Sequence, residues 1–299
     1  MDNPPIQLPL SSPEELPHSG GPPPPARPDP DNPPWGIWGA LGLLLMSFML
    51  MIVIQGFLVF AYALRRGVPL AVEAIAQFSI KDPGAIAVAL VALVIAHAFT
   101  LGLAWLLVTR GGRFPFLRTL GWDWGGGLTL WRCVGLALAL YGVGLAIIWL
   151  TGNPENEMER LLRSSRAAAL ITAFAATFTA PIVEEIVFRG MLYSALRRVV
   201  GSGWAVSTVF LLFALIHVPQ YLPSYGVLAA ILLLSFVLTL VRARTGSLLP
   251  CVVIHTIFNG IQSLGIVFAP YLDRLFPEQA APAPGLLVEL LLRLYGFAW

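Results

Sequence analysis

Long apolar runs separated by short polar connectors fill most of the chain from Trp35 onward, and they restrict the folds that it can adopt. A helical run of about 20 residues, rising 1.5 Å per residue, crosses a hydrocarbon layer of about 30 Å. The composition agrees, because 57% of the 299 residues are hydrophobic and only 11% are charged, against about 25% charged in soluble domains. Backbone polar groups in lipid are satisfied within helices. The sequence therefore predicts an all-α polytopic membrane protein.

The ends of the predicted spans are marked by arginines or by turn residues such as Thr245-Gly246-Ser247. We expect a bundle of 7–8 transmembrane helices, in which residues 284–298 form either a short eighth span or an interfacial helix. The other seven predicted spans cover residues 37–64, 84–109, 129–151, 167–196, 203–218, 224–241 and 248–268.

Three segments are predicted to lie outside the spans. Residues 1–34 hold 13 of the 25 prolines and lack the pattern of a signal peptide, so a disordered proline-rich N-terminal tail is predicted. The aromatic residues of 110–128 indicate a segment in the head-group layer. The alternating charges of 152–166 favour a solvated helix with local ion pairs.

The charge balance argues against nucleic acid as a partner. The formal net charge is only +2, and the arginines sit at the ends of apolar runs, where lipid head groups account for them. Cys133 and Cys251 lie in apolar runs without redox or metal spacing, so we interpret both as packing residues.

Six ionisable residues remain inside the spans once the residues at the ends of the runs are set aside. A charge at the centre of a membrane helix costs roughly 2.5–3.5 kcal/mol on insertion scales, so such residues indicate a functional site. Five of the six fall within one third of the chain. They are His97, Glu184, Glu185, Arg189, His217 and His255. The outlier, His97, is predicted to be a packed, hydrogen-bonded helix contact.

Helical spacing divides the stretch that carries the carboxylates. Glu185 and Arg189 are four residues apart and are expected to form an ion pair. Glu184 points about 100° away on an α-helix, which leaves it free for chemistry. Pro181 removes a backbone donor and is expected to free the carbonyl of Thr177 and to bend the helix.

Polar groups on three spans are expected to meet at one depth. His217 follows Phe213 by four residues, and Asn259 follows His255 by four, so each pair shares a helix face. Measured from one membrane face at 1.5 Å per residue, Glu184, His217, His255 and Asn259 lie about 20, 22, 12 and 18 Å deep. A carboxylate base, histidines and a carboxamide donor are the groups that activate water and stabilise an oxyanion. The set favours hydrolysis of an amide bond.

The three motifs together resemble those of a known family. Glu184-Glu185-x-x-x-Arg189, then Phe213-x-x-x-His217, then His255-x-x-x-Asn259 are similar to the motifs of the CPBP family of intramembrane endopeptidases, the CAAX prenyl-protease and bacteriocin-processing group. The similarity covers roughly residues 150–268. The resemblance implies a catalytic core at 152–268, and the apolar runs on either side predict N-terminal transmembrane helices at 35–151 and a C-terminal segment with a short apolar helix at 269–299.

The resemblance also implies roles for the site residues. Glu184 takes the position of the water-activating glutamate, and His217 that of the histidine that positions or activates this water. His255 and Asn259 correspond to the proposed oxyanion stabilisers, with Glu185 and Arg189 as their neighbours in the catalytic set. Zinc on His217, His255 and a glutamate is chemically acceptable. The absence of a His-Glu-x-x-His helix favours the metal-free alternative.

We therefore expect an intramembrane endopeptidase, a hydrolase that cuts near the C-terminus of a prenylated protein or within a peptide precursor. Its expected partners are the lipid bilayer and the peptide or prenylated-protein substrate, and its expected place is the plasma membrane, with the site open to the cytoplasm. The alternative is a non-proteolytic scaffold or bacteriocin self-immunity protein with the same fold. A proton-coupled transporter would show symmetric halves, which this sequence lacks.

Overall fold

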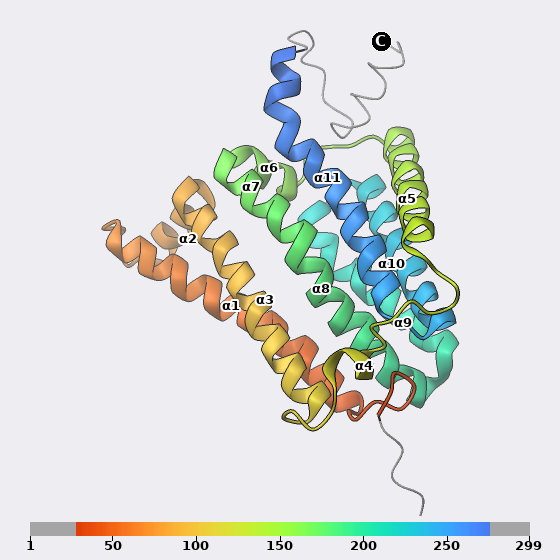
Figure 1. The fold of residues 1–299 in the computed structure, drawn as a ribbon. Helices are drawn as coiled ribbons and strands as arrows, with labels where there is room; N and C mark the ends of the chain where they lie inside the picture. Colours follow the sequence, from red (N-terminus) through yellow and green to blue (C-terminus); the bar gives the residue numbers. More distant parts are fainter. Residues whose placement is uncertain (1–27, 276–299) are drawn as a thin grey trace, which may run out of the picture.

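The computed structural model describes residues 28–275, and this range contains helices and loops without a strand (Figure 1). The all-α prediction is confirmed for this range. In chain order the helices are α1 (Ile37–Arg65), α2 (Val72–Lys81), α3 (Pro83–Thr109), α4 (Phe116–Leu120), α5 (Leu130–Thr151), α6 (Glu157–Ser164), α7 (Arg166–Phe174), the π-helix η1 (Ala175–Thr179), α8 (Ala180–Glu184), the π-helix η2 (Glu185–Leu192), α9 (Tyr193–Tyr221), α10 (Tyr225–Thr245) and α11 (Leu249–Leu275).

Six helical segments of the described chain are long and apolar enough to cross a membrane. The predicted spans 167–196 and 203–218 both fall within one of them, Arg166–Tyr221, in which two helices meet across a kink between the two predicted spans. Its backbone is interrupted at Gly201, where φ is 80° and ψ is 168°. Glycine tolerates this positive φ, since it has no Cβ. The count of 7–8 stays a prediction, and residues 284–298 lie outside the described range.

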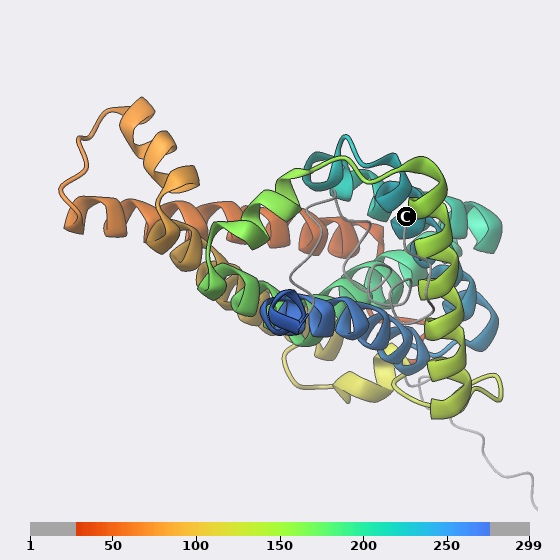
Figure 2. The same cartoon turned by 90° about the horizontal axis from the view of Figure 1, so that it is seen from above.

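The helices form two groups that differ in how far they extend from the centre. α1 and α3 pack along each other and, with α2 at their far end, project away from the rest of the protein (Figures 1 and 2). In the other group, α10 contacts α5 and α9, and α11 contacts α5, α7 and η1. The segment from η1 to η2 lies between the groups, since it contacts α1 and α3 as well as α11.

The end of the predicted disordered tail is held in place, which corrects its boundary. Arg110 donates to the carbonyl of Pro34 through Nε at 3.0 Å and Nη2 at 2.6 Å. Nη1 of Arg198 donates to the carbonyl of Pro33 at 3.1 Å. Residues 28–34 are therefore anchored to α9 and to the end of α3, because arginines satisfy their carbonyls. The earlier part of the predicted tail lies outside the described residues.

The predicted charged helix in 152–166 is confirmed. Within α6, Arg160 forms ion pairs with Glu157, three residues earlier, and with Glu155, at 3.5 Å. These side chains are more than half exposed, so the pairs are solvated. Surface pairs of this kind contribute about 0–1 kcal/mol.

The connector 110–128 positions the start of α11. The backbone N–H of Leu248 donates to the carbonyl of Gly121 at 2.7 Å, and the hydroxyl of Ser247 donates to Asp123 at 2.5 Å. A Cβ on Gly125 would lie 2.0 Å from the Ser247 hydroxyl oxygen, so the close approach requires glycine there. This loop therefore sets the entry of the helix that carries His255.

Candidate active site

The helix that carries the carboxylates is partly π-helical, which differs from the regular α-helix that the spacing predicts. The carboxamide nitrogen of Asn259 donates to the carbonyl of Ala176 at 2.9 Å. In the i to i+5 pattern of η1, this carbonyl would accept from residue 181, and Pro181 has no N–H. The carbonyl freed by the proline is thus that of Ala176 and not that of Thr177 as predicted. Asn259 on α11 supplies the missing donor.

The predicted ion pair between Glu185 and Arg189 is confirmed. Nη1 of Arg189 lies 2.9 Å from Oε1 of Glu185, and both side chains are 0% exposed. Burying two charges requires good geometry and further hydrogen bonds, because desolvation penalises each ion by several kcal/mol. The pair is therefore part of a larger polar network.

Two polar residues of α10 complete the coordination of Arg189, and the analysis of ionisable residues missed them. Nε of Arg189 donates to the Thr239 hydroxyl at 3.2 Å, and Nη2 donates to the Ser235 hydroxyl at 2.7 Å and to its carbonyl at 3.1 Å. The guanidinium also lies 4.4 Å from the ring centroid of Phe213. The spacing of Ser235 and Thr239, four apart in an apolar run, is the signal that indicates them.

His255 lies between the two adjacent glutamates. Its Nδ1 donates to Oε1 of Glu185 at 2.8 Å, and its Nε2 lies 3.7 Å from Oε2 of Glu184. The carboxylate of Glu185 accepts, so it holds the Nδ1–H tautomer and turns Nε2 toward Glu184. Atoms 3.7 Å apart are able to share one water at about 2.8 Å from each.

The two glutamates differ in access to solvent. The side chain of Glu184 is 24% exposed and that of Glu185 is 0% exposed. Among the described residues, Oε2 of Glu185 is buried without a hydrogen-bond partner. Glu184 is therefore the carboxylate that a substrate or water can reach, whereas Glu185 contacts other buried side chains.

His217 joins the site through an aromatic neighbour. Its Nδ1 donates to the carbonyl of Phe213 at 2.7 Å, which leaves Nε2 available as an acceptor. The ring centroid of Phe213 lies 4.7 Å from that of His217 and 6.0 Å from that of His255. The two histidines are thus placed on a common aromatic side chain.

The outlying histidine is a packed contact, as predicted. His97 is 7% exposed, and its Nδ1 lies 2.8 Å from the hydroxyl oxygen of Thr179 in η1. The bond ties α3 to the segment that precedes the carboxylates.

Two further side chains hold carbonyls of η2. Nε of Arg242, which is 2% exposed, donates to the carbonyl of Arg189 at 3.1 Å, and its Nη2 donates to the Ser194 hydroxyl at 3.2 Å. Nε1 of Trp35 donates to the carbonyl of Met191 at 3.1 Å. The position of Arg242 at the end of an apolar run predicts a residue that ends a span, and it does not show that the side chain turns inward.

Zinc on His217, His255 and a glutamate stays a prediction. In the part of the chain that the structure describes, no three His, Cys, Asp or Glu side chains are grouped to hold a metal ion. Nδ1 of His255 and Nδ1 of His217 each form a hydrogen bond, which leaves Nε2 as the remaining ring nitrogen of both histidines. Cys133 and Cys251 are buried, free and packed in one apolar cluster, as predicted.

The described residues thus combine six helical segments that are long and apolar enough to cross a membrane with a buried network of carboxylates and a histidine. Residues 166–261 match the family model described as Type II CAAX prenyl endopeptidase Rce1-like. This match confirms the family resemblance seen in the sequence, and the family is one of proteases. No curated protein and no solved structure gave a match.

Proposed function

We propose that this protein is an intramembrane endopeptidase in which Glu184 activates water for hydrolysis of a peptide bond. The observation that carries the proposal is the contrast between two adjacent carboxylates. Glu184 is partly exposed and faces a histidine, whereas Glu185 is buried and ion-paired. The family match over residues 166–261 supports the same reaction class.

In the proposed reaction, water bound beside Glu184 attacks the substrate carbonyl carbon while the carboxylate takes one proton from it. The carbonyl π electrons move to oxygen and form a tetrahedral oxyanion. When the C–N bond breaks, the protonated Glu184 returns its proton to the leaving amine. The products are a carboxylic acid and an amine, and the base is regenerated.

The neighbouring side chains position this water and stabilise the oxyanion. Nε2 of His217 accepts from the water, since its Nδ1 proton is held by a backbone carbonyl. The second N–H of the Asn259 carboxamide is the donor for the oxyanion, because the first is held by Ala176. His255 lies beside this base, with its Nε2 3.7 Å from Oε2 of Glu184.

The Glu185–Arg189 pair has a positioning role. Glu185 orients His255 through Nδ1, and Arg189 balances the buried charge. We propose that the substrate is a polypeptide reached from the bilayer, cut near the C-terminus of a prenylated protein or within a peptide precursor. The family description names the prenyl class.

The experiment compares cleavage of matched prenylated and unprenylated peptides by the purified protein and by Glu184→Gln. The expected loss is about 10²- to 10⁴-fold, the usual contribution of a general base. Glu73→Gln, the same change at an exposed residue of α2, is the control and is expected to keep full activity.

Two further arms sharpen the result. Cleavage is followed with a chelator and after zinc is returned, and the proposed metal-free mechanism predicts no change in either case. Undiminished cleavage by Glu184→Gln contradicts the assignment of the base. Absence of cleavage by the parent protein on every peptide, with partner binding retained, favours the scaffold alternative.

A further inference from the structure

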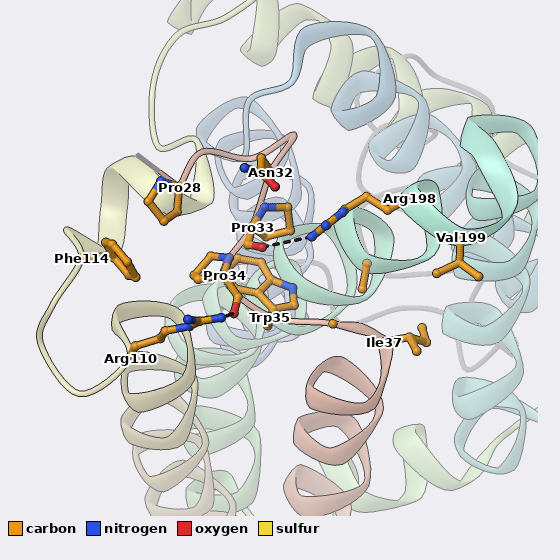
Figure 3. Close-up of a pocket in the computed structure, with 12 residues that line it drawn as sticks. Pro28, Asn32, Pro33, Pro34, Trp35, Ile37, Arg110, Phe114, Arg198 and Val199 are labelled. Atoms are coloured by element: carbon orange, nitrogen blue, oxygen red, sulfur yellow. Dashed lines mark hydrogen bonds between the residues drawn. The ribbon is translucent and has the colours of Figure 1, made fainter. Parts of the chain in front are cut away.

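A hollow of about 720 Å³ lies away from the carboxylates, where the segment before α1 crosses the end of α3 and the first turns of α9 (Figure 3). Its volume falls in the range of about 300–1,000 Å³ that small-molecule sites occupy. Its wall combines two arginines with apolar side chains. Its lining includes Pro34, Trp35, Arg110, Phe114, Arg198 and Val199.

The two arginines of this hollow have N–H donors without a partner and a positive charge without a carboxylate among the described residues. Arg110 binds the Pro34 carbonyl through Nε and Nη2, and Arg198 binds the Pro33 carbonyl through Nη1 alone. Within residues 28–275 neither guanidinium has a carboxylate in ion-pair distance, whereas the adjacent Arg197 pairs with Asp31. Carbonyl bonds leave the cationic charge uncompensated, so the hollow favours an anion.

The position of the hollow in the fold limits the kind of anion. Arg110 directly follows the apolar helix α3, and Ile37 begins the apolar helix α1, so the hollow lies where two apolar helices end. In a bilayer, helix ends of this kind meet the head-group layer. Trp35 and Val199 add apolar surface beside the charges. The site thus combines a cationic part with an apolar part at lipid depth.

We propose that this hollow binds the phosphate group of an anionic phospholipid, with Arg110 and Arg198 as its ligands. The planar guanidinium presents paired N–H groups that match phosphate oxygens. The glycerol backbone and the first part of the acyl chains lie against the apolar wall. This lipid site goes beyond the proposed protease function and does not depend on it.

The first test leaves the anchoring arginines intact. Val199→Glu places a carboxylate in the hollow, and Val200→Glu places the same group one residue further, at a residue that does not line it. The full-length purified protein is loaded with phosphatidylglycerol or phosphatidylcholine, and retained lipid is measured by native mass spectrometry. Phosphatidylglycerol is expected to bind more tightly to the parent, and Val199→Glu is expected to weaken it at least fivefold. Val200→Glu is expected to retain it.

The second test removes charge. Arg110→Gln and Arg198→Gln are each expected to weaken phosphatidylglycerol binding about fivefold. Arg132→Gln is the control, because this exposed arginine also donates to a backbone carbonyl, that of Gly127, but does not line the hollow. Inorganic phosphate at millimolar concentration is added as a competitor, and the lipid is expected to stay bound.

Three results would overturn the lipid site. Equal retention of phosphatidylglycerol and phosphatidylcholine would show that the hollow does not discriminate between an anionic and a zwitterionic head group. Equal losses in Val199→Glu and Val200→Glu would place the binding elsewhere on the surface. Displacement of the lipid by inorganic phosphate would show that the hollow takes the free anion, without a contribution from the apolar wall.

Discussion

The α1–α3 pair and the η2–α10–α11 region both consist of helices apolar enough for a membrane, yet they associate in different ways. α1 and α3 pack along each other and bury small residues such as Ala40, Ala92 and Ala104, each 0% exposed. The second region buries Glu185 and Arg189, whose hydrogen bonds reach α10 and α11. Lipid gives little hydrophobic drive between helices, so close packing and polar bonds are the two available means.

The two regions are therefore expected to tolerate different substitutions. The stability of small-residue packing depends on side-chain volume, whereas the stability of a buried ion pair depends on both charged partners being present. The comparison therefore predicts a large response to loss of a charge in the second region and a moderate response to added volume in the first.

The largest expected effect is that of Arg189→Met. It leaves the buried carboxylate of Glu185 without its cation, and breaking a buried pair in this way costs about 3–5 kcal/mol of folding stability. Thermal and denaturant unfolding in detergent measures the loss. Arg66→Met, at an exposed arginine near the Tyr62 ring of α1, is the control, with an expected change within about 0.5 kcal/mol.

A double variant sharpens this result. Replacing both partners, Glu185→Leu with Arg189→Met, removes the two desolvation terms together and is expected to be more stable than Arg189→Met alone. If the double variant is as unstable as the single one or less stable, the loss reflects volume and not an unpaired charge.

The next effect concerns volume in the α1–α3 pair. Ala104→Leu adds a larger side chain where Ala104 is 0% exposed, and overpacking costs about 1–3 kcal/mol. Ala98→Leu on the same helix is the control, because Ala98 lines an open hollow of about 510 Å³. Unfolding measurements on the two variants are expected to differ, and equal losses would contradict small-residue packing as the basis of this contact.

The smallest effect is expected at the bond between α3 and η1, the segment that leads through α8 to the second region. His97 and Thr179 join α3 to η1 at 2.8 Å, and a double-mutant cycle with His97→Phe and Thr179→Val isolates this bond. Interhelical hydrogen bonds in membranes average about 0.6 kcal/mol in such cycles. A coupling above about 2 kcal/mol would mean that the regions are joined more strongly than by one neutral bond.

Several features of the site follow from helical periodicity and were predicted. The pairing of Glu185 with Arg189 needs only a spacing of four, which local geometry supplies. The approach of His255 to Glu184 agrees with the predicted layer near the middle of the membrane, although the predicted depths of the two residues differ by about 8 Å. The lone His97 was placed as a packed contact because it lies far along the chain from the other ionisable residues.

Other features depend on long-range contacts and were missed. The π register of η1 determines which carbonyl Pro181 leaves free, that of Ala176, and the donor to this carbonyl, Asn259, lies 83 positions later in the chain. The inward turn of Arg242 and the docking of residues 28–34 depend on which carbonyls happen to lie nearby. No spacing rule in the sequence contains that information.

The sequence by itself determined that this chain consists of membrane-type helices and that its polar residues are concentrated in one segment. Both follow from the cost of placing backbone groups and charges in lipid, which acts on each residue locally. Only the tertiary structure decided that His255 bonds Glu185 on one side and faces Glu184 on the other, and that the side chain of Glu185 is fully buried. Access and pairing depend on the atoms that other helices bring to the same place.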